Sequence, residues 1–349
     1  MQIGENIYAV GDGAYLLVGE KTALIDTVAL GEEDGLVYNI EQIISDIQLD
    51  YVILNHTEPD KSYGLSAVLE RYPNAEVIAT IAGIRNLKEM ISLPFNERAA
   101  KDNAVLNLGN GIALRFIITP NLNWPDSMVT YEENTGTLFS CDLFSSGAEK
   151  YLMTYPDYVQ NALTRLSELN ITAIMTGTGD VLKGDDITKA FEVYNNLLEE
   201  YRANEQAKSV LILFSSTYGA TREMAECIHT ELENAGVNVK MCDAETDELP
   251  DINSVSAIIA GTGTYENGAS KSVMRSLCSV NAARMRHKPF FTFGSYGWSG
   301  EGAEILYRML QSLGMKPFSK PFTSIFGMSD ETRERLIHHT RKFAELILE

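Results

Sequence analysis

From Ser209 to the C-terminus, short apolar runs alternate with segments that have the periodicity of a helix. Each apolar run is long enough for one buried strand, and each helical segment is long enough to cross back over a sheet. We expect strands at 210–214, 238–242, 257–260, 289–293 and 316–326, and helices from about 220 to 234 and over 270–277, 303–313 and 330–348. Strands that alternate with helices form a parallel sheet covered on both faces. This half of the chain therefore predicts a doubly wound parallel sheet.

The first half has a different texture, because strands outnumber helices there. Alternating residues and glycine turns predict a β-meander over 7–10, 14–18 and 22–26. Later segments predict strands at 51–54, 76–79, 113–118, 137–140 and 171–175, with helices at 36–47, 64–71, 81–92, 155–169 and 187–202. This pattern is typical of a β-sandwich flanked by helices. A polar linker is expected at 203–208, so we divide the chain into domains 1–204 and 205–349.

Composition and charge exclude several classes of function. The formal charge of −20 makes nucleic acids and anionic membranes poor partners, because both are polyanions. The N-terminal segment has neither a basic stretch nor a long apolar run, so we expect a cytoplasmic protein without a membrane segment. The four cysteines form no CxxC pair, which speaks against a disulfide framework, a zinc knuckle or an iron–sulfur cluster.

A hydroxyl-rich loop joins the strand at 210–214 to the next helix. Backbone N–H groups and the positive end of a helix dipole meet at such a loop, and this arrangement suits a phosphate. The loop has neither the Gly-Lys-Ser/Thr of a Walker loop nor the three glycines of a dinucleotide loop, so a monophosphate fits best. The alternative is an ordinary helix cap. The candidate phosphate-binding residues are Ser215, Ser216, Thr217, Tyr218, Gly219, Ala220 and Thr221.

Two further loops at strand ends are rich in glycine and aromatic residues. Glycines let the backbone approach a planar ligand, and aromatic side chains offer faces on which a ring can stack. A ring beside a monophosphate suggests flavin mononucleotide (FMN), although each loop alone could be a glycine turn with a surface aromatic. The candidates are Gly261, Thr262, Gly263, Thr264, Tyr265, Asn267 and Gly268 in one loop, and Ser295, Tyr296, Gly297, Trp298 and Gly300 in the other.

The segment Phe293-Gly-Ser-Tyr-Gly-Trp-Ser-Gly300 resembles a signature of the flavodiiron proteins, also called A-type flavoproteins. The resemblance covers essentially the whole chain. It implies a metallo-β-lactamase-like αββα sandwich followed by a flavodoxin-like domain, with FMN held by the three loops. It also implies a head-to-tail homodimer or a tetramer, in which the flavin of one subunit faces the metal site of the other.

Three segments of the first half resemble the metal-ligand segments of that family: Leu54-Asn-His-Thr-Glu-Pro-Asp60, Asn123-Trp-Pro-Asp-Ser-Met128 and Leu138-Phe-Ser-Cys-Asp142. The resemblance implies that four ligand positions are kept, namely His56, Glu58, Asp60 and Asp142. It also implies that three histidine positions are replaced, by Lys61, Asn123 and Thr178.

These replacements disfavour iron. His56 is the only histidine before residue 229, so two iron ions would share one imidazole. The Lys61 ammonium, about 4 Å from a divalent ion, would be repelled by roughly 8 kcal/mol at an effective dielectric of about 20. Deprotonating Lys61 at pH 7 instead would cost about 4.6 kcal/mol. We expect Lys61 to neutralise Glu58, Asp60 or Asp142 in place of a metal, and we expect no iron.

The first functional hypothesis is an FMN electron-transfer flavoprotein, served by a redox partner protein or a reductase, in which the sandwich has become a scaffold. The alternative is an oxygen or nitric oxide reductase with an altered iron site that uses FMN as the electron relay. A third hypothesis is a binding module in which FMN is structural. Hydrolysis of the lactamase type is disfavoured, because it depends on a metal-activated water.

Overall fold

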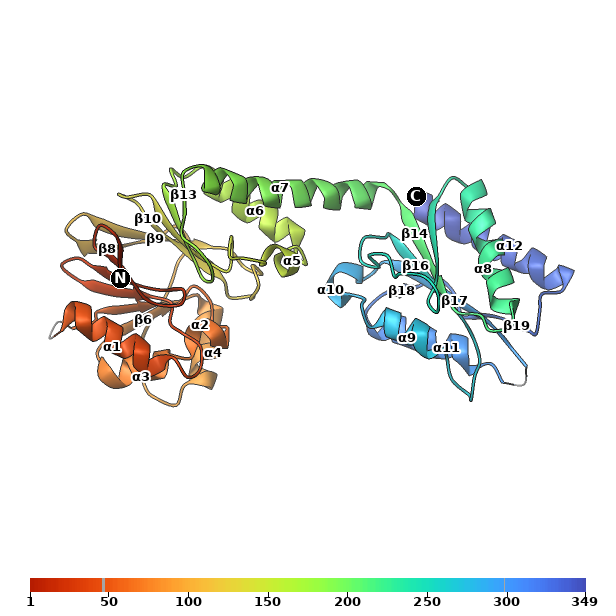
Figure 1. Cartoon of the computed structure of the whole chain (residues 1–349), viewed down its shortest axis with the longest axis horizontal. Helices are drawn as coiled ribbons and strands as arrows, with labels where there is room; N and C mark the ends of the chain where they lie inside the picture. The colour runs from red at the N-terminus through yellow and green to blue at the C-terminus, as the bar shows by residue number, and fades with distance from the viewer. Residues whose placement is uncertain (46–47, 298) are drawn as a thin grey trace. The chain divides into compact units, whose positions relative to one another are not determined.

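The computed structural model describes residues 1–45, 48–297 and 299–349. The chain divides into two compact units, Met1–Leu198 and Glu199–Glu349 (Figure 1). The division falls inside helix α7 (Asp185–Gln206). The prediction of a linker from residue 203 is wrong for 203–206, which continue the helix, because Ala, Glu and Gln are good helix formers and no Gly or Pro interrupts them.

The N-terminal unit is built on two sheets. The first has the order β1 (Gln2–Gly4), β2 (Ile7–Gly11), β3 (Ala14–Val18), β4 (Thr22–Ile25), β5 (Tyr51–Ile53), β6 (Glu76–Ala79) and β7 (Asn96–Ala99). The second has the order β13 (Leu182–Lys183), β12 (Ala173–Thr176), β11 (Thr137–Cys141), β10 (Met128–Glu132), β9 (Ile112–Ile118) and β8 (Val105–Gly109). The first sheet is antiparallel from β1 to β4 and parallel from β4 to β7. Strands β1, β7, β8, β10 and β13 were not predicted.

Alternating side chains place the two sheets face to face. Leu17 and Ile25 point into the core between the sheets, where they join Phe116 and Phe139. Their neighbour Leu16 points to the opposite face and packs under the helices. The helices are α1 (Glu33–Ile44), α2 (Pro59–Ser62), α3 (Leu65–Arg71) and α4 (Ile81–Met90), followed later in the chain by α5 (Glu149–Leu152) and α6 (Pro156–Ser167). Figure 1 shows α1 to α4 along one side of this unit and α6 along the other. The predicted αββα sandwich is confirmed.

Helix α1 begins three residues before the predicted start. Its first turn carries Glu33 and Asp34, which stabilise the helix start by their interaction with the positive end of the helix dipole. Because these residues are not apolar, the apolar periodicity did not include them. The predicted end at Ile47 lies outside the described residues.

The C-terminal unit has a parallel sheet with the order β15 (Asn238–Asp243), β14 (Ser209–Phe214), β16 (Ala257–Gly263), β17 (Pro289–Tyr296) and β18 (Lys316–Pro317), with β19 (Phe322–Ile325) also paired to β17. Helices α8 (Ala220–Asn234) and α12 (Asp330–Leu348) cover one face. The other face is covered by α9 (Lys271–Leu277), α10 (Ala282–Met285) and α11 (Glu301–Ser312). The doubly wound sheet is confirmed.

The last predicted strand, 316–326, is wrong as one element, because it is split into β18 and β19. Pro321 lies between the two pieces and has no N–H with which to continue the ladder. Within the described ranges, the structure has no helix long and apolar enough to cross a bilayer.

Candidate functional site

The seven positions that the sequence singled out in the first half gather at one end of the two sheets. His56 and Glu58 follow β5, Asp60 and Lys61 lie in α2, and Asp142 follows β11. The loop before β10 contributes Asn123, and the loop after β12 contributes Thr178. A pocket of about 270 Å³ opens here, lined by Glu58, Asp60, Asn123, Asp142, Ser145, Ser146, Tyr151 and Thr178.

Asn123 joins two carboxylates with one amide group. Its Nδ2 donates to Glu58 Oε2 and, over 2.6 Å, to Asp142 Oδ2. The reverse orientation of the amide would set a carbonyl oxygen against two carboxylates, which repel it. Its backbone has a φ of +71°, a conformation that asparagine tolerates better than most residues. The space between Glu58 and Asp142 is therefore closed by N–H groups, which cannot coordinate a cation.

Lys61 is a buried cation, only 3% exposed. Its Nζ lies 3.9 Å from Asp60 Oδ2 and donates to Thr178 Oγ1 over 3.4 Å. Of the three carboxylates expected to neutralise it, Asp60 is the one at ion-pair distance within the described part of the chain. An ammonium taken out of water needs such partners, and it would oppose a metal ion placed beside it.

His56 lies between the two carboxylates that Asn123 joins. Its Nε2 is 3.4 Å from Glu58 Oε2 and 3.6 Å from Asp142 Oδ2, and its Nδ1 is 2.9 Å from Cys141 Sγ. Burial by itself lowers the pKa of His56, but Glu58 and the charges of Asp142 and Asp26 outweigh it, so the pKa is raised above its ordinary value. When it is protonated, His56 adds positive charge to this cluster.

The groups behind His56 are also perturbed. Burial, with the charges of Asp26 and Asp142, holds the pKa of the Cys141 thiol well above its ordinary range, so the group stays a thiol at neutral pH. Burial raises the pKa of Asp26 to about 6, against the lowering effect of His56 and of the Asn55 hydrogen bonds. Asp26 Oδ1 accepts the Asn55 N–H over 2.7 Å, which fixes the start of the loop that carries His56.

These residues do not fit two iron ions. The cluster offers one imidazole, and an ammonium, an amide and a hydroxyl stand at the replaced positions. His56 Nε2 makes no hydrogen bond among the described residues, and two donor sets share that histidine: His56 with Glu58 and Asp60, and His56 with Cys141 and Asp142. Both sets therefore depend on a single imidazole.

In the C-terminal unit, the predicted phosphate loop leads from β14 into α8. Gly219, with a φ of +88°, is the residue at which the chain turns into the helix. Thr217, Tyr218 and Gly219 are exposed, and Ser216 is half-buried. The first α8 residues thus present N–H groups at an open helix start. The Ser215 hydroxyl is buried instead and donates to Glu245 Oε1 over 3.3 Å, so it supports the loop from within.

The two predicted ring loops are tied to each other. Tyr265 and Gly268 close a tight turn, in which Glu266 and Asn267 both have positive φ. Asn267 Oδ1 accepts from Ser299 Oγ over 3.3 Å, and Thr264 Oγ1 accepts the Gly302 N–H over 3.2 Å.

Two glycines of these loops lie close to neighbouring atoms, and glycine is required at Gly294, where the neighbour is backbone. A Cβ on Gly263 would lie 2.7 Å from Tyr265 Oη, and one on Gly294 would lie 2.1 Å from the Thr262 carbonyl oxygen.

The predicted loop residues differ in exposure. The Thr262 hydroxyl is buried and accepts the Ser270 N–H, so it is structural. Tyr265 Oη lies beside the phosphate loop, 2.9 Å from Thr217 Oγ1, and Ser295 Oγ is 3.1 Å from Thr221 Oγ1. Trp298 lies outside the described residues.

Two residues near these loops were missed. Glu245 follows β15 and accepts hydroxyl groups from Ser215, Ser270 and Ser272. Phe326 follows β19, and its N–H donates to the Tyr296 carbonyl oxygen over 2.9 Å. Both residues lie at the carboxyl edge of the parallel sheet, so the rule that ligand-binding residues gather there could have identified them.

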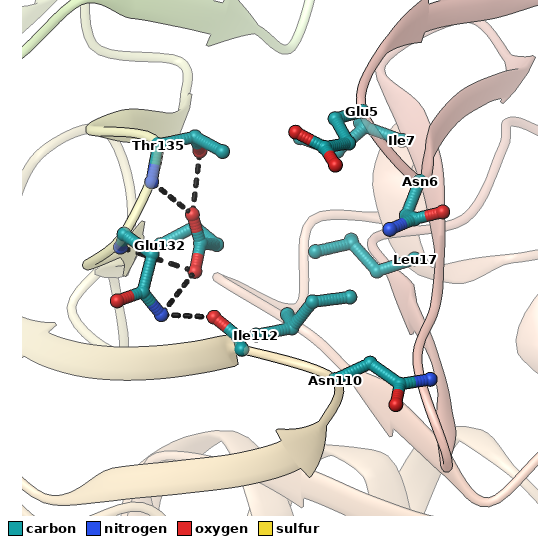
Figure 2. A pocket seen from close by; sticks show the side chains of 10 residues that line it. Glu5, Asn6, Ile7, Leu17, Asn110, Ile112, Glu132 and Thr135 are labelled. Carbon is teal, nitrogen blue, oxygen red and sulfur yellow. Dashed lines mark hydrogen bonds between the residues drawn. The ribbon is translucent and has the colours of Figure 1, made fainter.

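A larger pocket in the N-terminal unit is unrelated to the predicted residues. It has a volume of about 350 Å³ and is lined by Glu5, Asn6, Ile7, Leu17, Asn110, Gly111, Ile112, Glu132, Asn134 and Thr135 (Figure 2). The buried Glu132 carboxylate accepts the N–H groups of Ala113, Asn134 and Thr135. Burial alone would raise the pKa of Glu132, but these bonds and the Thr135 hydroxyl lower it. Glu132 thus stabilises the turn that follows β10.

Comparison with known families and proteins adds to this geometry. Residues 12–175 match the ODP family beta lactamase, and residues 212–338 match the flavodoxin family. The chain is 32% identical to the flavo-diiron protein FprA2 of Clostridium acetobutylicum, covering 97% of this chain and 92% of that protein. It is 28% identical to a nitric oxide reductase of Moorella thermoacetica, covering 88% and 83%. Rubredoxin oxygen:oxidoreductase of Desulfovibrio gigas has the same fold, with a TM-score of 0.66 at 24% identity, over 96% of this chain and 90% of that one.

Proposed function

The chain belongs to the flavodiiron protein family, and from that premise we propose that it is an FMN-dependent electron-transfer flavoprotein that works without a di-iron centre. A separate electron-carrier protein or a reductase would reduce it. The proposal assigns the flavin to domain 205–349 and a scaffold role to domain 1–204. The flavodoxin match supports the assignment of the flavin to the second domain. The hydrogen bond from Asn123 to Asp142 supports the scaffold role of the first domain.

The residues of the C-terminal unit suit FMN. The hydroxyl groups of Ser216, Thr217 and Thr221 and the N–H groups at the start of α8 would hold the phosphate without a cation, because the helix dipole adds to their hydrogen bonds. The loops 261–268 and 294–300 would flank the ring, and Tyr265 and Tyr296 offer aromatic faces. FMN, when bound, supplies transfer of one or two electrons.

The observation that carries the metal-free proposal is the amide of Asn123. It donates to both Glu58 and Asp142, and so occupies carboxylate oxygen atoms that would have to be free to hold a metal ion. Lys61 supplies positive charge that ions would otherwise bring, and the raised pKa of His56 favours its charged form. Glu58 fits this arrangement, because its interaction with His56 lowers its pKa despite partial burial.

The alternative is an altered iron enzyme that reduces oxygen or nitric oxide. Two observations favour it: the donor sets centred on His56, and the similarity to a protein named nitric oxide reductase. It would require Asn123 to turn away and Lys61 to lose its proton or leave the pocket.

The products of oxygen reduction distinguish the two functions. The protein is reduced anaerobically by light and then mixed with oxygen, with and without prior dialysis against an iron chelator. The proposal predicts hydrogen peroxide as the product and no effect of the chelator, since flavin alone gives peroxide. Formation of water, or of nitrous oxide from nitric oxide, and its loss after chelation would support the altered iron enzyme instead.

A further inference from the structure

The cavity of about 350 Å³ in the N-terminal unit lies at the opposite end of the sandwich from His56 and Asp142 (Figure 2). An adjoining hollow of about 270 Å³, which shares Glu5 and Thr135 with it, reaches Thr137 at the start of β11, whereas Asp142 follows the end of that strand. Strand residues rise about 3.3 Å each, so the five residues of β11 separate the two ends by roughly 16 Å. The cavity is therefore distinct from the site described above.

Three hairpin turns form the rim of the cavity. They join β1 to β2, β8 to β9 and β10 to β11, and they contribute Glu5, Asn110 and Asn134. Asn134 Nδ2 donates to the Gly111 carbonyl oxygen, which ties the second turn to the third. The Asn134 N–H donates to the buried Glu132 carboxylate over 3.2 Å. Because these bonds hold the turns in place, the cavity exists before a ligand binds.

The floor of the cavity is apolar, and its charged residues are acidic. Ile7, Leu17 and Ile112 form the floor, and all three belong to the core between the two sheets. The described residues that line the cavity include two carboxylates, Glu5 and Glu132, and no lysine, arginine or histidine. An apolar floor beside unbalanced negative charge suits a ligand that has an aliphatic chain and a positively charged end.

Glu5 is the carboxylate that a ligand can reach. The Glu132 oxygens are already occupied by the turn after β10. The Glu5 carboxylate, in contrast, has no hydrogen bond or ion pair with any residue in the described ranges, and Figure 2 shows it pointing into the cavity from the same side as Leu17. The side chains of Asn6 and Asn110 also make no hydrogen bond to a described residue. Their carbonyl oxygens can therefore accept further N–H groups.

We propose that this cavity binds a small organic ammonium ion, with its N–H groups on the Glu5 carboxylate and its aliphatic chain on Ile7 and Ile112. The formal charge of −20 of the whole chain raises the local concentration of cations. An inorganic cation would leave the apolar floor uncovered, and an anion would meet two carboxylates. The proposal depends neither on the flavin nor on the metal content of the protein.

The probe for the test is n-hexylamine, titrated calorimetrically into the full chain loaded with FMN. It should bind saturably at one site, and more weakly as salt is added. Ethylamine should bind far more weakly, because each methylene group that is buried raises the affinity by up to about fourfold. Hexan-1-ol and hexanoate keep the aliphatic chain without the positive charge, so both should bind more weakly than n-hexylamine.

Variants and methyl signals locate the site. Glu5→Gln should weaken n-hexylamine binding roughly fivefold, as expected for a partly exposed charge pair, and should leave hexan-1-ol binding unchanged. Glu70→Gln is the matched control, because Glu70 is exposed in α3 and its loss changes the net charge equally. In protein with labelled isoleucine methyl groups, n-hexylamine should shift the NMR signals of Ile7 and Ile112, and leave that of the exposed Ile81 in α4 unmoved.

Four results would overturn the inference. They are the lack of saturable binding of n-hexylamine, equal effects of Glu5→Gln and Glu70→Gln, methyl shifts that spare Ile7 and Ile112, and tighter binding of hexanoate than of n-hexylamine. The last result would identify an anion site at Lys183, the cation that lines the adjoining hollow. The test has no step through the flavin, so each of these results removes this inference and leaves the proposed function standing.

Discussion

Replacing Asn123 by aspartate distinguishes a metal-free cluster from a metal site. In the structure, the Asn123 amide donates to Glu58 and to Asp142, with 2.6 Å between its nitrogen and Asp142 Oδ2. Asn123→Asp is nearly isosteric, but it puts a third carboxylate in contact with two others. If the amide stabilises the two carboxylates by its hydrogen bonds, the variant loses stability. If a metal occupies the space between them, the variant gains a ligand.

The size of the effect follows from the distances. Two unit charges 2.6 Å apart repel by about 6 kcal/mol at an effective dielectric of about 20, so the variant should bind a proton instead. Protonating a carboxyl group of ordinary pKa near 4 costs about 4 kcal/mol at pH 7 and about 1.4 kcal/mol at pH 5. One of the two hydrogen bonds is lost as well, which adds about 1 kcal/mol, because Glu58 is a third exposed and partly solvated. We expect the free energy of unfolding to fall by about 4–5 kcal/mol at pH 7 and about 2 kcal/mol at pH 5.

The sign of the pH dependence follows from the same shift. The variant's carboxyl cluster has a raised pKa in the folded state, so between pH 7 and pH 5 the folded state binds more protons than the unfolded state. Its stability relative to wild type therefore recovers as the pH falls.

Urea unfolding of the full chain measures both quantities. Trp298 is changed to Phe in wild type and variants alike, so that Trp124, next to the substituted residue, reports the N-terminal unit. Asn121→Asp is the matched control, because Asn121 lies in the same loop with a similar φ of +62° and donates no side-chain bond to Glu58 or Asp142 in the structure. Equal stability of Asn123→Asp and Asn121→Asp, or stabilisation of Asn123→Asp by added ferrous ion beyond wild type, would refute the reasoning.

Three other predictions concern the metal positions, the flavin and pH. A triple variant with restored imidazoles combines Lys61→His, Asn123→His and Thr178→His. Elemental analysis should find iron bound to this variant and none bound to wild type. Thr221→Val should weaken FMN binding about tenfold to a hundredfold in a flavin fluorescence titration, because a hydrogen bond to a charged group contributes about 1.5–3 kcal/mol, whereas Thr230→Val on the same helix should not. Burial, aided by the charges of His338 and Lys342, lowers the pKa of His339. The contribution of His339 to the free energy of unfolding is therefore present above the ordinary histidine pKa of about 6.5 and is lost as the pH falls below it. His339→Phe should flatten this part of a profile of stability against pH, and an unchanged slope would contradict the assignment.

Most of the fold could be predicted because buried strands and amphipathic helices leave different periods in the sequence. The doubly wound half was the clearer of the two, since its central strands β14 and β16 are buried on both faces and appear as apolar runs. Strand β7 escaped prediction for the opposite reason. All four residues of Asn96–Ala99 are exposed at a sheet edge, so no apolar alternation marks them.

The site could be predicted in part. Polar residues that follow neighbouring strands meet at one edge, so the gathering of His56, Glu58 and Asp142 could be foreseen from their positions. The contact of Cys141 with His56 could not. The register shifts between Phe139 and Cys141, where β11 pairs with β12, and Cys141 has a φ of +50°, so the simple alternation of side chains fails there.

The double hydrogen bond of Asn123 was equally hidden. It depends on a side-chain direction set by a left-handed backbone, which the sequence only suggests by placing an asparagine in a loop. The pairing of Lys61 with Asp60, rather than with Glu58 or Asp142, also depends on where a long flexible side chain comes to rest.

The metal and flavin content of the full chain, purified without oxygen and without chelators, tests the central claim most directly. Elemental analysis gives iron per chain, and the visible spectrum after acid release gives FMN per chain. The account predicts about one FMN per chain, with iron far below one atom per chain even after incubation with ferrous ion. About two iron atoms per chain, bound stoichiometrically and retained on gel filtration, would contradict it.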